Sequence, residues 1–355
     1  MKVTLKDIAE RLGMNYSTVS YALNGKGSIK EETRDYIRRV AADMGYVPDH
    51  SARQIHSGKN DLVGIIVPNV LFEYGEFCEH AYRLLNNAGY QVMIAVSEFS
   101  AGKEAEIIRT MLSRNVAGLI MTPTRRVFHA EAADDPFRLL AARRTPVVIR
   151  NMNTPLSCDC VRADYRECGR MLGSILRKKR KRRVVFAVPH PAPFADNVTE
   201  TRAGLEEAMG GAVELFALDY EDCPDSGFAP GNPHYGGQLR HLLGAGGIKT
   251  GRRLFRELRK QGLPEAVVCS HEHAALGMEL EAAECGIAIP GELALAVIER
   301  TLFSNAAPVP LTSAGVSAQV LAAGTARLLL DRMRSPDAAQ KICLIPPELH
   351  SGNSL

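Results

Sequence analysis

The sequence predicts a multidomain fold, in which a small all-α head precedes a two-lobed α/β region built on parallel sheets. Two observations lead to this prediction. Apolar residues recur at helical spacing in three segments of the first 47 residues. From residue 61 onward, short β-rich runs alternate with helical stretches, and the alternation starts again near the middle of the chain. We therefore place the head at 1–47, a linker at 48–60 and the α/β region at 61–355.

Three short helices are predicted in the head. Thr4 opens the first with a capping-box-like pattern, and Gly13 ends it. Asn15 can cap the second helix, which runs to about Asn24. A third helix carries apolar residues on one side over 29–44. Three such helices bury only a small core, so the head lies near the lower size limit of a domain.

The linker, DHSARQIHSGKN, offers one or two turns of helix before Gly58. So short a helix is marginal in water, because the cost of nucleating it is not recovered. We expect it to become ordered only when a partner holds it.

The α/β region divides into two similar halves with a break near 151–164. β-rich runs separated by helices are typical of βαβ units on a parallel sheet. The expected helices of the first half lie at 73–88, 103–115 and 136–143, and the expected strands of both halves lie at 62–68, 90–96, 116–122, 145–150, 183–188, 213–218, 265–270 and 292–298.

Two halves predict two lobes with a cleft between them. In open α/β sheets ligands bind at the carboxyl ends of the strands, so the cleft is the expected binding site. Residues 221–251, rich in Gly and Pro, are interpreted as a long irregular insertion. We assign about 61–160 and 292–318 to the N-lobe, and about 161–291 and 319–355 to the C-lobe.

Charge and composition narrow the class of protein. Residues 1–60 hold 10 Lys or Arg against 7 Asp or Glu and the remainder balances, so the net charge of +3 lies in the first 60 residues. A positive excess in one segment is the charge distribution typical of a protein that binds a polyanion, although here it is modest. No apolar run approaches the ~20 residues of a membrane span, and the N-terminus does not resemble a signal peptide. Eight scattered cysteines then indicate reduced thiols. We expect a cytoplasmic protein without a membrane partner.

The second helix of the head has an unusual outer face. On a helix, Val19, Ala22 and Leu23 share one side. A solvated helix ordinarily presents Glu and Lys on its other side. This one instead presents hydrogen-bonding side chains without any acid, namely Tyr16, Ser17, Ser20, Tyr21 and Asn24.

Longer motifs resemble a known family. The stretch TLKDIAERLGMNYSTVSYALNG is followed by ETRDYIRRVAADMGYVPDHSARQI, and weaker similarities are GIIVP, NVAGLIMTP, PLT at 310–312 and the C-terminal LIPPEL. With these motifs the chain resembles the lactose/galactose repressor (LacI/GalR) family of bacterial transcription regulators over nearly its whole length. The resemblance implies a helix-turn-helix head, a hinge helix and a two-lobed sensor with the fold of periplasmic binding proteins.

The resemblance makes the second helix of the head the recognition helix, which enters the major groove of double-stranded DNA. Its base-reading residues are then Tyr16, Ser17, Ser20 and Tyr21. The family very often has Arg at the last position, where it makes two hydrogen bonds to guanine. Tyr21 cannot, so we expect an operator that departs from the common consensus at that base. A surface helix for protein contact is the alternative. Six further polar residues either contact phosphate groups or are ordinary solvated positions, namely Thr4, Thr18, Asn24, Lys26, Lys30 and Thr33.

The family's hinge helices pair on DNA and push an apolar side chain into the minor groove, which kinks the duplex. By position this side chain is Ile55, where the family usually has Leu. Ala52 is small enough for close approach of two helices, and Arg53 is the implied backbone contact.

A small-molecule effector in the cleft is implied, and we favour a sugar or a sugar derivative. The family usually has Asp where Glu272 and Glu299 stand. Its ligand-binding Arg usually lies three residues before a glycine, where this chain has Thr201 beside Arg202. The two glutamates either accept hydroxyl hydrogen bonds or form ion pairs that close the lobes. The matching cleft positions are Phe72, Tyr74, Arg150, Asn151, Arg202, Glu272 and Glu299.

Three further motifs have less specific meanings. CSHEH at 269–273 gathers metal-ligating side chains without the spacing of a metal site, so no metal is expected. Cys158 and Cys160 are either a redox pair or reduced thiols beside a strand. RKKRKRR at 177–183 is either a nucleic-acid patch or a solvated face at the C-terminus of a helix, where cations are favoured. We favour the solvated face.

No phosphate loop, nucleophile elbow or paired-carboxylate motif is present, so we expect neither an enzyme nor a cofactor. The expected function is a homodimeric, effector-controlled transcription regulator on a pseudo-palindromic operator, rather a repressor than an activator, in the cytoplasm at the nucleoid. A two-lobed solute-binding protein of the sugar-transport type is the alternative, and an enzyme fused to a DNA-binding head is a more distant one. The head and the missing signal peptide argue against the transport protein.

Overall fold

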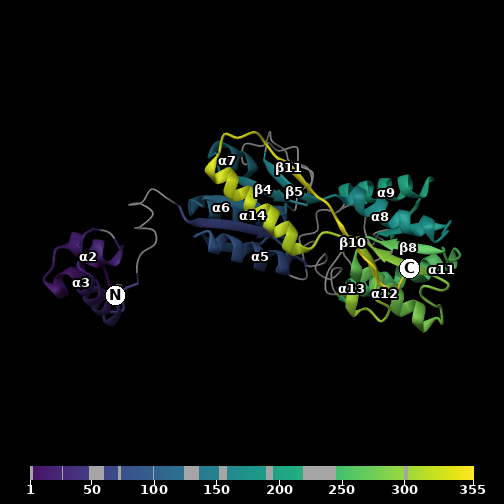
Figure 1. Ribbon diagram of the computed structural model, residues 1–355, viewed down its shortest axis with the longest axis horizontal. Coiled ribbons are helices and arrows are strands. Elements are labelled where there is room, and N and C mark those ends of the chain that lie inside the picture. The colour runs from purple at the N-terminus through teal and green to yellow at the C-terminus, as the bar shows by residue number, and fades with distance from the viewer. Residues whose placement is uncertain are drawn as a thin grey trace. The chain divides into compact units, whose positions relative to one another are not determined.

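The computed structural model shows two compact units, Met1–Asn60 and Asp61–Leu355 (Figure 1). Their boundary coincides with the end of the predicted linker. The structure describes residues 3–25, 27–47, 60–70, 73–98, 100–123, 136–151, 158–188, 195–218, 245–299 and 303–355. The predicted site residues that lie outside the described residues are Lys26, Ala52, Arg53, Ile55 and Phe72.

The head unit contains the three predicted helices, α1 (Leu5–Leu12), α2 (Tyr16–Leu23) and α3 (Glu31–Asp43). Thr4 caps α1, and the capping box is completed by the Asp7 carboxylate, which accepts the Thr4 N–H at 2.7 Å. Gly13 ends α1 with a φ of 60°. Asn15 caps α2 by accepting the N–H of Ser17. The buried core of the unit consists of Ile8, Ala9, Val19, Ala22, Ile37 and Ala41.

The first lobe of the larger unit contains six parallel strands: β1 (Leu62–Val67), β2 (Gln91–Val96), β3 (Gly118–Met121), β4 (Val147–Arg150), β5 (Asp159–Ala163) and β11 (Ile342–Ile345). They are ordered β11-β5-β4-β3-β1-β2. Both faces are covered, as parallel sheets require. α5 (Glu73–Asn87) and α14 (Ala318–Arg334) pack on one face, and α6 (Ala101–Ser113) and α7 (Pro136–Ala142) on the other (Figure 1).

The second lobe is built in the same way from β6 (Val184–Val188), β7 (Glu214–Ala217), β8 (Ala266–Cys269), β9 (Ala294–Val297), β10 (Thr312–Gly315) and β12 (Glu348–His350). The order is β12-β10-β9-β8-β6-β7, with β12 antiparallel to β10. α8 (Tyr165–Lys178) and α9 (Ala195–Met209) pack on one face. α11 (Ala245–Lys260) and α12 (Glu272–Glu284) pack on the other, and α13 (Phe303–Ala306) is a short helix beside α12.

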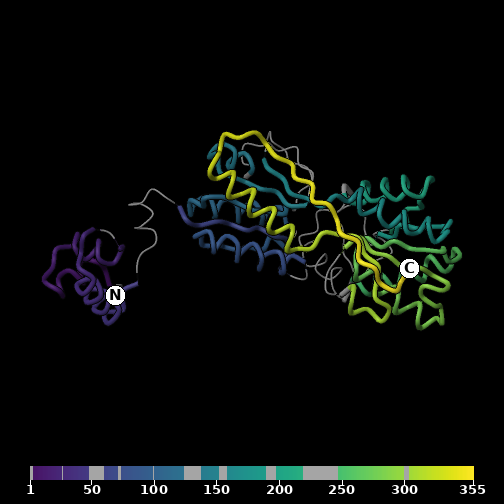
Figure 2. The backbone as a smooth tube through the Cα atoms, viewed as in Figure 1, coloured from purple at the N-terminus to yellow at the C-terminus, as the bar shows by residue number. Residues whose placement is uncertain are grey.

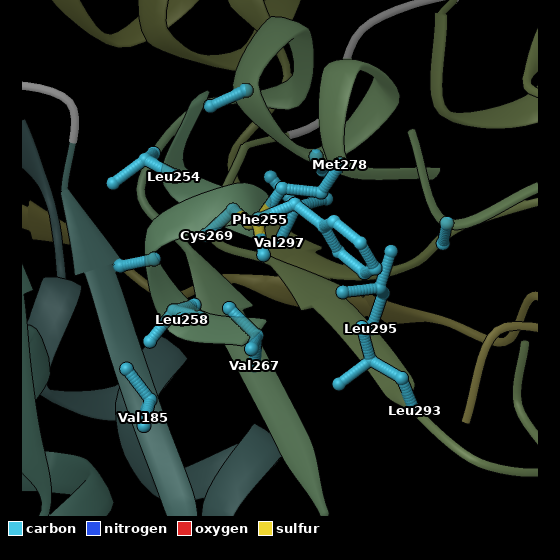
Figure 3. Close-up of a cluster of buried hydrophobic side chains, with 14 of the residues drawn as sticks. Val185, Leu254, Phe255, Leu258, Val267, Cys269, Met278, Leu293, Leu295 and Val297 are labelled. Atoms are coloured by element: carbon cyan, nitrogen blue, oxygen red, sulfur yellow. Dashed lines mark hydrogen bonds between the residues drawn. The ribbon is translucent and has the colours of Figure 1, made fainter. Parts of the chain in front are cut away.

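The core under α11 and α12 is closely interdigitated. Phe255 and Leu258 of α11 and Met278 of α12 pack over the sheet residues Val267 and Leu295 (Figure 3). All five side chains are inaccessible to solvent. Among the described helices, none combines the length and the apolar character needed to cross a membrane.

The predicted lobe membership of the C-terminal segments is wrong. We expected 292–318 in the first lobe and 319–355 in the second. Instead β9 and β10 belong to the second sheet, α14 and β11 belong to the first, and β12 returns to the second (Figure 2). β5 also lies inside the segment predicted as the break. Local strand propensity does not specify which sheet a strand joins, because that depends on crossover connections between distant segments.

Glycines allow close contact between helix pairs of the second lobe. A Cβ atom on Gly204 of α9 would overlap the carbonyl oxygen of Arg166 in α8, and one on Gly169 of α8 would overlap that of Thr201. Gly251 of α11 and Gly277 of α12 approach each other's helices in the same way. A side chain at these positions forces the helices apart, so the second lobe depends on them.

Candidate nucleic-acid interface and ligand crevice

The outer face of α2 is open to solvent. Tyr16 and Tyr21 are 49% and 52% exposed and Ser17 is exposed, whereas Val19 and Ala22 are buried in the head core. The helix itself, YSTVSYAL, contains no acidic residue. A polyanion that approaches this face therefore meets hydroxyl groups and no carboxylate of α2.

Local hydrogen bonds hold the polar side chains of this face. The Ser17 hydroxyl donates to Asn15 Oδ1 at 3.1 Å. Asn24 Nδ2 donates to the Ser20 carbonyl oxygen at 2.8 Å and to Ser20 Oγ at 3.3 Å. Side chains ordered before binding lose less conformational entropy when they bind.

The segment that follows α2 fixes the direction of Tyr21. Arg34 Nη2 donates to the Gly27 carbonyl oxygen at 3.4 Å, which ties this segment to α3. Gly27 has a φ of 73°, and a Cβ atom there would lie 3.4 Å from Tyr21 Cδ2. The Tyr21 ring thus rests against the Gly27 backbone.

The predicted phosphate-contacting residues differ in accessibility. Lys30 is exposed at the N-terminus of α3, and Thr18 and Thr33 are half-buried. Thr4 is exposed, but its hydroxyl donates to Asp7 Oδ2 at 2.8 Å. The Thr4 N–H and hydroxyl together hold the pKa of Asp7 below its usual value, so a negative charge stays beside Thr4. Thr4 therefore serves first as a helix cap.

Arg150 ends β4 and is fully buried. Its guanidinium donates to the Glu73 carboxylate at the start of α5 and, at 3.4 Å, to Thr122 Oγ1. Its central carbon lies 4.9 Å from the Tyr74 ring centre and 4.5 Å from that of Phe77. Although burial opposes its charge, the Glu73 carboxylate raises the pKa of Arg150. Tyr74 and Arg150, which were both predicted as cleft positions, therefore lie in contact with each other.

A cavity of about 40 Å³ lies where the two lobes meet. That volume holds one or two water molecules, whereas small-molecule pockets have about 300–1,000 Å³. This cavity, as the described residues line it, is therefore too small for a sugar. The cavity is lined by Glu73, Asn151, Ala163, Tyr165, Ile298, Glu299, Val316, Ala318 and Leu321.

Asn151 both shapes and lines this crevice. It follows β4 with a φ of 50°, a conformation that Asn tolerates better than most residues. Its Oδ1 accepts the Ala163 N–H at 3.2 Å, and its own N–H donates to the Val161 carbonyl oxygen at 2.9 Å. These bonds fix the ends of β4 and β5 against each other.

Glu299 follows β9 and faces the crevice from the second lobe. Its Oε2 accepts the Glu272 N–H at 3.3 Å, and its Oε1 lies 3.9 Å from His271 Nε2. Burial, reinforced by Glu272 and Glu73, raises the pKa of Glu299 well above its usual value. Burial, with the neighbouring His273, lowers the pKa of His271 to about 4. At neutral pH His271 is therefore a neutral imidazole, and burial favours the uncharged form of Glu299 as well.

Glu272 is buried at the start of α12, where its carboxylate accepts the Ser304 hydroxyl of α13. This bond, like the one from the Glu272 N–H to Glu299, lies within the second lobe. An ion pair that does join the lobes is Arg162 of β5 with Glu200 of α9, whose two carboxylate oxygens lie 2.8 and 2.6 Å from Arg162 Nη1. The sequence did not predict this pair.

Arg202 is directed away from the crevice. Its Nε donates to Glu206 Oε1 at 3.0 Å, and the same oxygen accepts the Val213 N–H at 3.2 Å, just before β7. Parallel strands begin at the edge of the sheet opposite the crevice. Arg202 was predicted as a cleft residue because it lies next to the position of the family's ligand-binding arginine. Its side chain instead lies on the side of α9 that faces away from the crevice.

Several residues of the crevice escaped the sequence analysis. Glu73 and Tyr165 begin helices directly after strand–loop segments, which is a signal that could have identified them. Burial raises the pKa of Tyr165, so it is a neutral phenol. Thr122 immediately follows β3, and His271 immediately precedes Glu272.

Cysteine and metal chemistry are simple in the described part of the chain. Its seven cysteines, Cys158 and Cys160 among them, are free thiols. Burial raises the pKa of Cys269 to about 12. In those same residues no three His, Cys, Asp or Glu side chains come together as a metal site would require, those of 269–273 included.

Comparisons with known proteins give the two units separate matches. Residues 4–49 match the family model for bacterial regulatory proteins of the lacI family, and residues 174–355 match that for the periplasmic binding protein-like domain. The chain is 25% identical to catabolite control protein A of Staphylococcus aureus over 305 residues, 85% of this chain and 83% of that protein. It is 32% identical to the sucrose operon repressor of Klebsiella pneumoniae over 124 residues, 34% of this chain and 37% of that protein.

A solved structure shares the fold over the whole length. The crystal structure of the Lac repressor dimer bound to operator and the anti-inducer ONPF matches with a TM-score of 0.79 and 16% identity, covering 100% of this chain and 99% of that one. The helical head and the two-lobed α/β unit with parallel sheets are thus common to both.

Proposed function

Because this chain belongs to the lacI family of bacterial DNA-binding transcription regulators, we propose that it is a homodimeric repressor whose affinity for a pseudo-palindromic operator is set by a small-molecule effector. The observation that carries the proposal is the solvent-facing, acid-free side of α2, on a unit separate from the two-lobed unit. The matched relatives are transcription regulators, which argues against an enzyme and against a sugar-transport protein.

The proposed recognition uses α2 in the major groove. Tyr16, Ser17, Ser20 and Tyr21 contact base edges; Tyr16, Ser17 and Tyr21 are exposed, and Ser20 is half-buried. The phenol of Tyr21 offers one donor and acceptor where an arginine offers two parallel donors. The base that it faces is then read through one hydrogen bond or through apolar contact with a thymine methyl group.

Phosphate and minor-groove contacts complete the proposed complex. Two heads on inverted half-sites double the contacts of one small head, which is why a dimer is part of the proposal. Ile55 is the proposed minor-groove wedge, with Ala52 at the helix contact and Arg53 at the backbone. The proposed phosphate contacts are Thr4, Thr18, Asn24, Lys26, Lys30 and Thr33.

The proposed effector is a sugar or a sugar derivative. The Glu272 carboxylate and Asn151 Oδ1 can accept hydrogen bonds, and burial favours the protonated form of Glu299, which can donate one. Such a mixture of donors and acceptors suits the hydroxyl groups of a polyol. Tyr74 and Tyr165 supply apolar ring surface beside them. The name of the sucrose operon repressor, a relative over part of the chain, supports this class of ligand.

Control of the DNA heads then follows from lobe separation. A ligand larger than this 40 Å³ cavity shifts the population towards an arrangement with wider lobe spacing, and the Arg162–Glu200 pair is a contact that such opening breaks. We propose a head at 1–47, a hinge at 48–60 and a sensor at 61–355. The protein works in the cytoplasm, associated with the nucleoid.

The DNA part of the proposal is tested by binding-site selection with the full-length protein, followed by affinity measurements on the selected duplex. Tyr16→Ala is expected to weaken specific binding at least tenfold. Tyr36→Ala is the matched control, because Tyr36 is a tyrosine of similar exposure, 51%, on α3 and not on α2. Equal losses for both variants, or none for Tyr16→Ala, would contradict the proposal.

The effector part is tested by screening monosaccharides and disaccharides for a change in operator affinity. Glu272→Gln is expected to abolish the response to the active sugar. Glu279→Gln is the matched control, since Glu279 is also buried on α12 but bonds to the Val309 N–H. A sugar response that survives Glu272→Gln unchanged would remove Glu272 from the site.

A further inference from the structure

A row of cationic side chains lies where α8 ends and β6 begins, at the edge of the second lobe opposite the crevice. Residues 178–183, KKRKRR, connect the end of α8 to the start of β6, and we call them the basic turn. Five of the six are exposed and Lys181 is half-buried. Among the residues that the structure describes, 178–182 form no ion pair, and Arg183 has a distant carboxylate partner in Glu214 at 3.8 Å.

The basic turn is held in a fixed conformation. The Glu265 carboxylate accepts the N–H groups of Arg182 and Arg183, and these bonds lower the pKa of Glu265. Arg183 Nη1 donates to the Gly262 carbonyl oxygen at 2.7 Å. Arg180 has a φ of 58°, which turns the chain sharply. The cations are therefore presented by a rigid turn and not by a loose tail.

The end of α11 extends this surface. The bond from Arg183 to Gly262 brings the last turn of α11 beside the basic turn. Arg259 there is exposed and, within the described residues, has no carboxylate partner, whereas Lys260 pairs with Glu257 at 2.8 Å. The patch thus combines two segments about 80 residues apart in sequence, since Arg183 and Gly262 are 79 positions apart.

A helix C-terminus explains only part of this charge. The helix dipole favours cations within the last turn, which accounts for Arg177 and Lys178. Its influence does not extend to 180–183, where the chain has left the helix. A solvated face would ordinarily alternate cations with carboxylates to limit repulsion. Four further cations in succession therefore need another explanation.

We propose that the basic turn binds the phosphates of double-stranded DNA outside the operator, as a second and sequence-independent DNA contact of this regulator. Residues 177–183 contain no aromatic side chain, so single-stranded bases have nothing to stack on. They contain no apolar side chain, so they lack the anchor of a protein interface or of an inserted membrane contact. Phosphate groups of a duplex require only positive charge in a row.

The experiment uses full-length protein whose heads are saturated with unlabelled operator duplex. A labelled random duplex is then titrated in, and its binding is measured by fluorescence anisotropy between 50 and 200 mM salt. The test variant is Lys179→Gln/Lys181→Gln/Arg182→Gln. The matched control is Arg114→Gln/Arg138→Gln/Arg327→Gln, which removes the same charge from exposed positions of the first lobe.

The test variant is expected to bind the random duplex at least tenfold more weakly at 50 mM salt. Its log–log salt slope should fall by about 3, because each phosphate contact contributes about 0.9. The control variant and the operator affinity of both should stay within twofold of wild type. Equal weakening in both variants, no second duplex bound by wild type, or a preference of the basic turn for anionic vesicles over duplex would each overturn the proposal.

Two additional arms keep the test decisive. If the triple variant unfolds early, Lys181→Gln and Arg182→Gln singly should each lower the slope by about 1. If wild type binds no operator, the random duplex is titrated without it. The missing operator binding would then contradict the proposed repressor function. Binding of the random duplex that still depends on the basic turn would support this inference.

Discussion

Arg150→Met tests whether the buried guanidinium holds the wall of the crevice. Methionine keeps an apolar stem against Tyr74 and Phe77 but removes the donors to Glu73 and Thr122. Removing one partner of a buried ion pair costs about 3–5 kcal/mol, because the remaining charge loses its compensation. The Glu73 side chain is 29% exposed and is partly screened by water. We therefore expect a loss of about 3 kcal/mol, or about 5 °C in Tm for a unit of this size.

The double variant Arg150→Met/Glu73→Gln separates charge from packing. Replacing both members of a buried pair is often close to neutral, so about 2 kcal/mol should return. The assay is urea unfolding of the full-length protein at pH 7, followed by circular dichroism. A control within the same lobe is Arg332→Met, which breaks the buried pair with Asp159 at the opposite end of the sheet.

Both single variants should be less stable, but only Arg150→Met should change the response to an effector. The reasoning is refuted if Arg150→Met unfolds within 1 kcal/mol of wild type. It is also refuted if the double variant is as unstable as the single one, since packing and not charge would then account for the loss.

Four more predictions follow from the described contacts and the sequence. Gly204→Ala should cost at least about 2 kcal/mol in urea unfolding because its methyl group separates α8 from α9, while Gly211→Ala, in open space, should change little. The free energy of unfolding of the wild-type protein should fall by up to about 3 kcal/mol between pH 6.5 and 4, because His271 stays neutral when folded and gains a proton when unfolded. His271→Gln should lack this loss. Identical stability profiles of the two proteins would exclude this. Tyr21→Arg should favour guanine at the base it faces by about 1–3 kcal/mol in binding-site selection, and an unchanged preference would argue against base contact. Ile55→Ala should weaken operator binding by a few kcal/mol without lowering Tm; unaltered affinity would exclude the wedge.

The elements of the fold with strong local signals were predictable. The caps at Thr4 and Asn15, the stop at Gly13 and the long apolar strands are visible in short windows of sequence. The strands β5, β10, β11 and β12 were not predicted. Polar or small residues interrupt the apolar run in β5 and β10, as TSAG of β10 shows. Their sheet membership is decided by chain crossings between the lobes, which no local pattern encodes.

The residues of the candidate site likewise fall into those with a local sequence signal and those that depend on the tertiary arrangement. Asn151 and Glu299 line the crevice, and Arg150 lies against Tyr74. All four residues lie within two positions of the end of a strand or the start of a helix, and that rule is local. The ion pair of Arg162 with Glu200 spans two lobes, so it depends on how the lobes meet. The direction of the Arg202 side chain depends on its position around the α9 helix. It bonds to Glu206 along α9 and does not point towards the crevice.

The central claim is that α2 in paired heads selects particular genomic sequences under the control of a crevice ligand. Genome-wide footprinting of the full-length protein on its own DNA, with and without cell metabolites, tests it most directly. We predict protected sites made of two inverted half-sites, whose occupancy changes when metabolites are added. Protection no greater than on random duplex at moderate ionic strength, under both conditions, would contradict it.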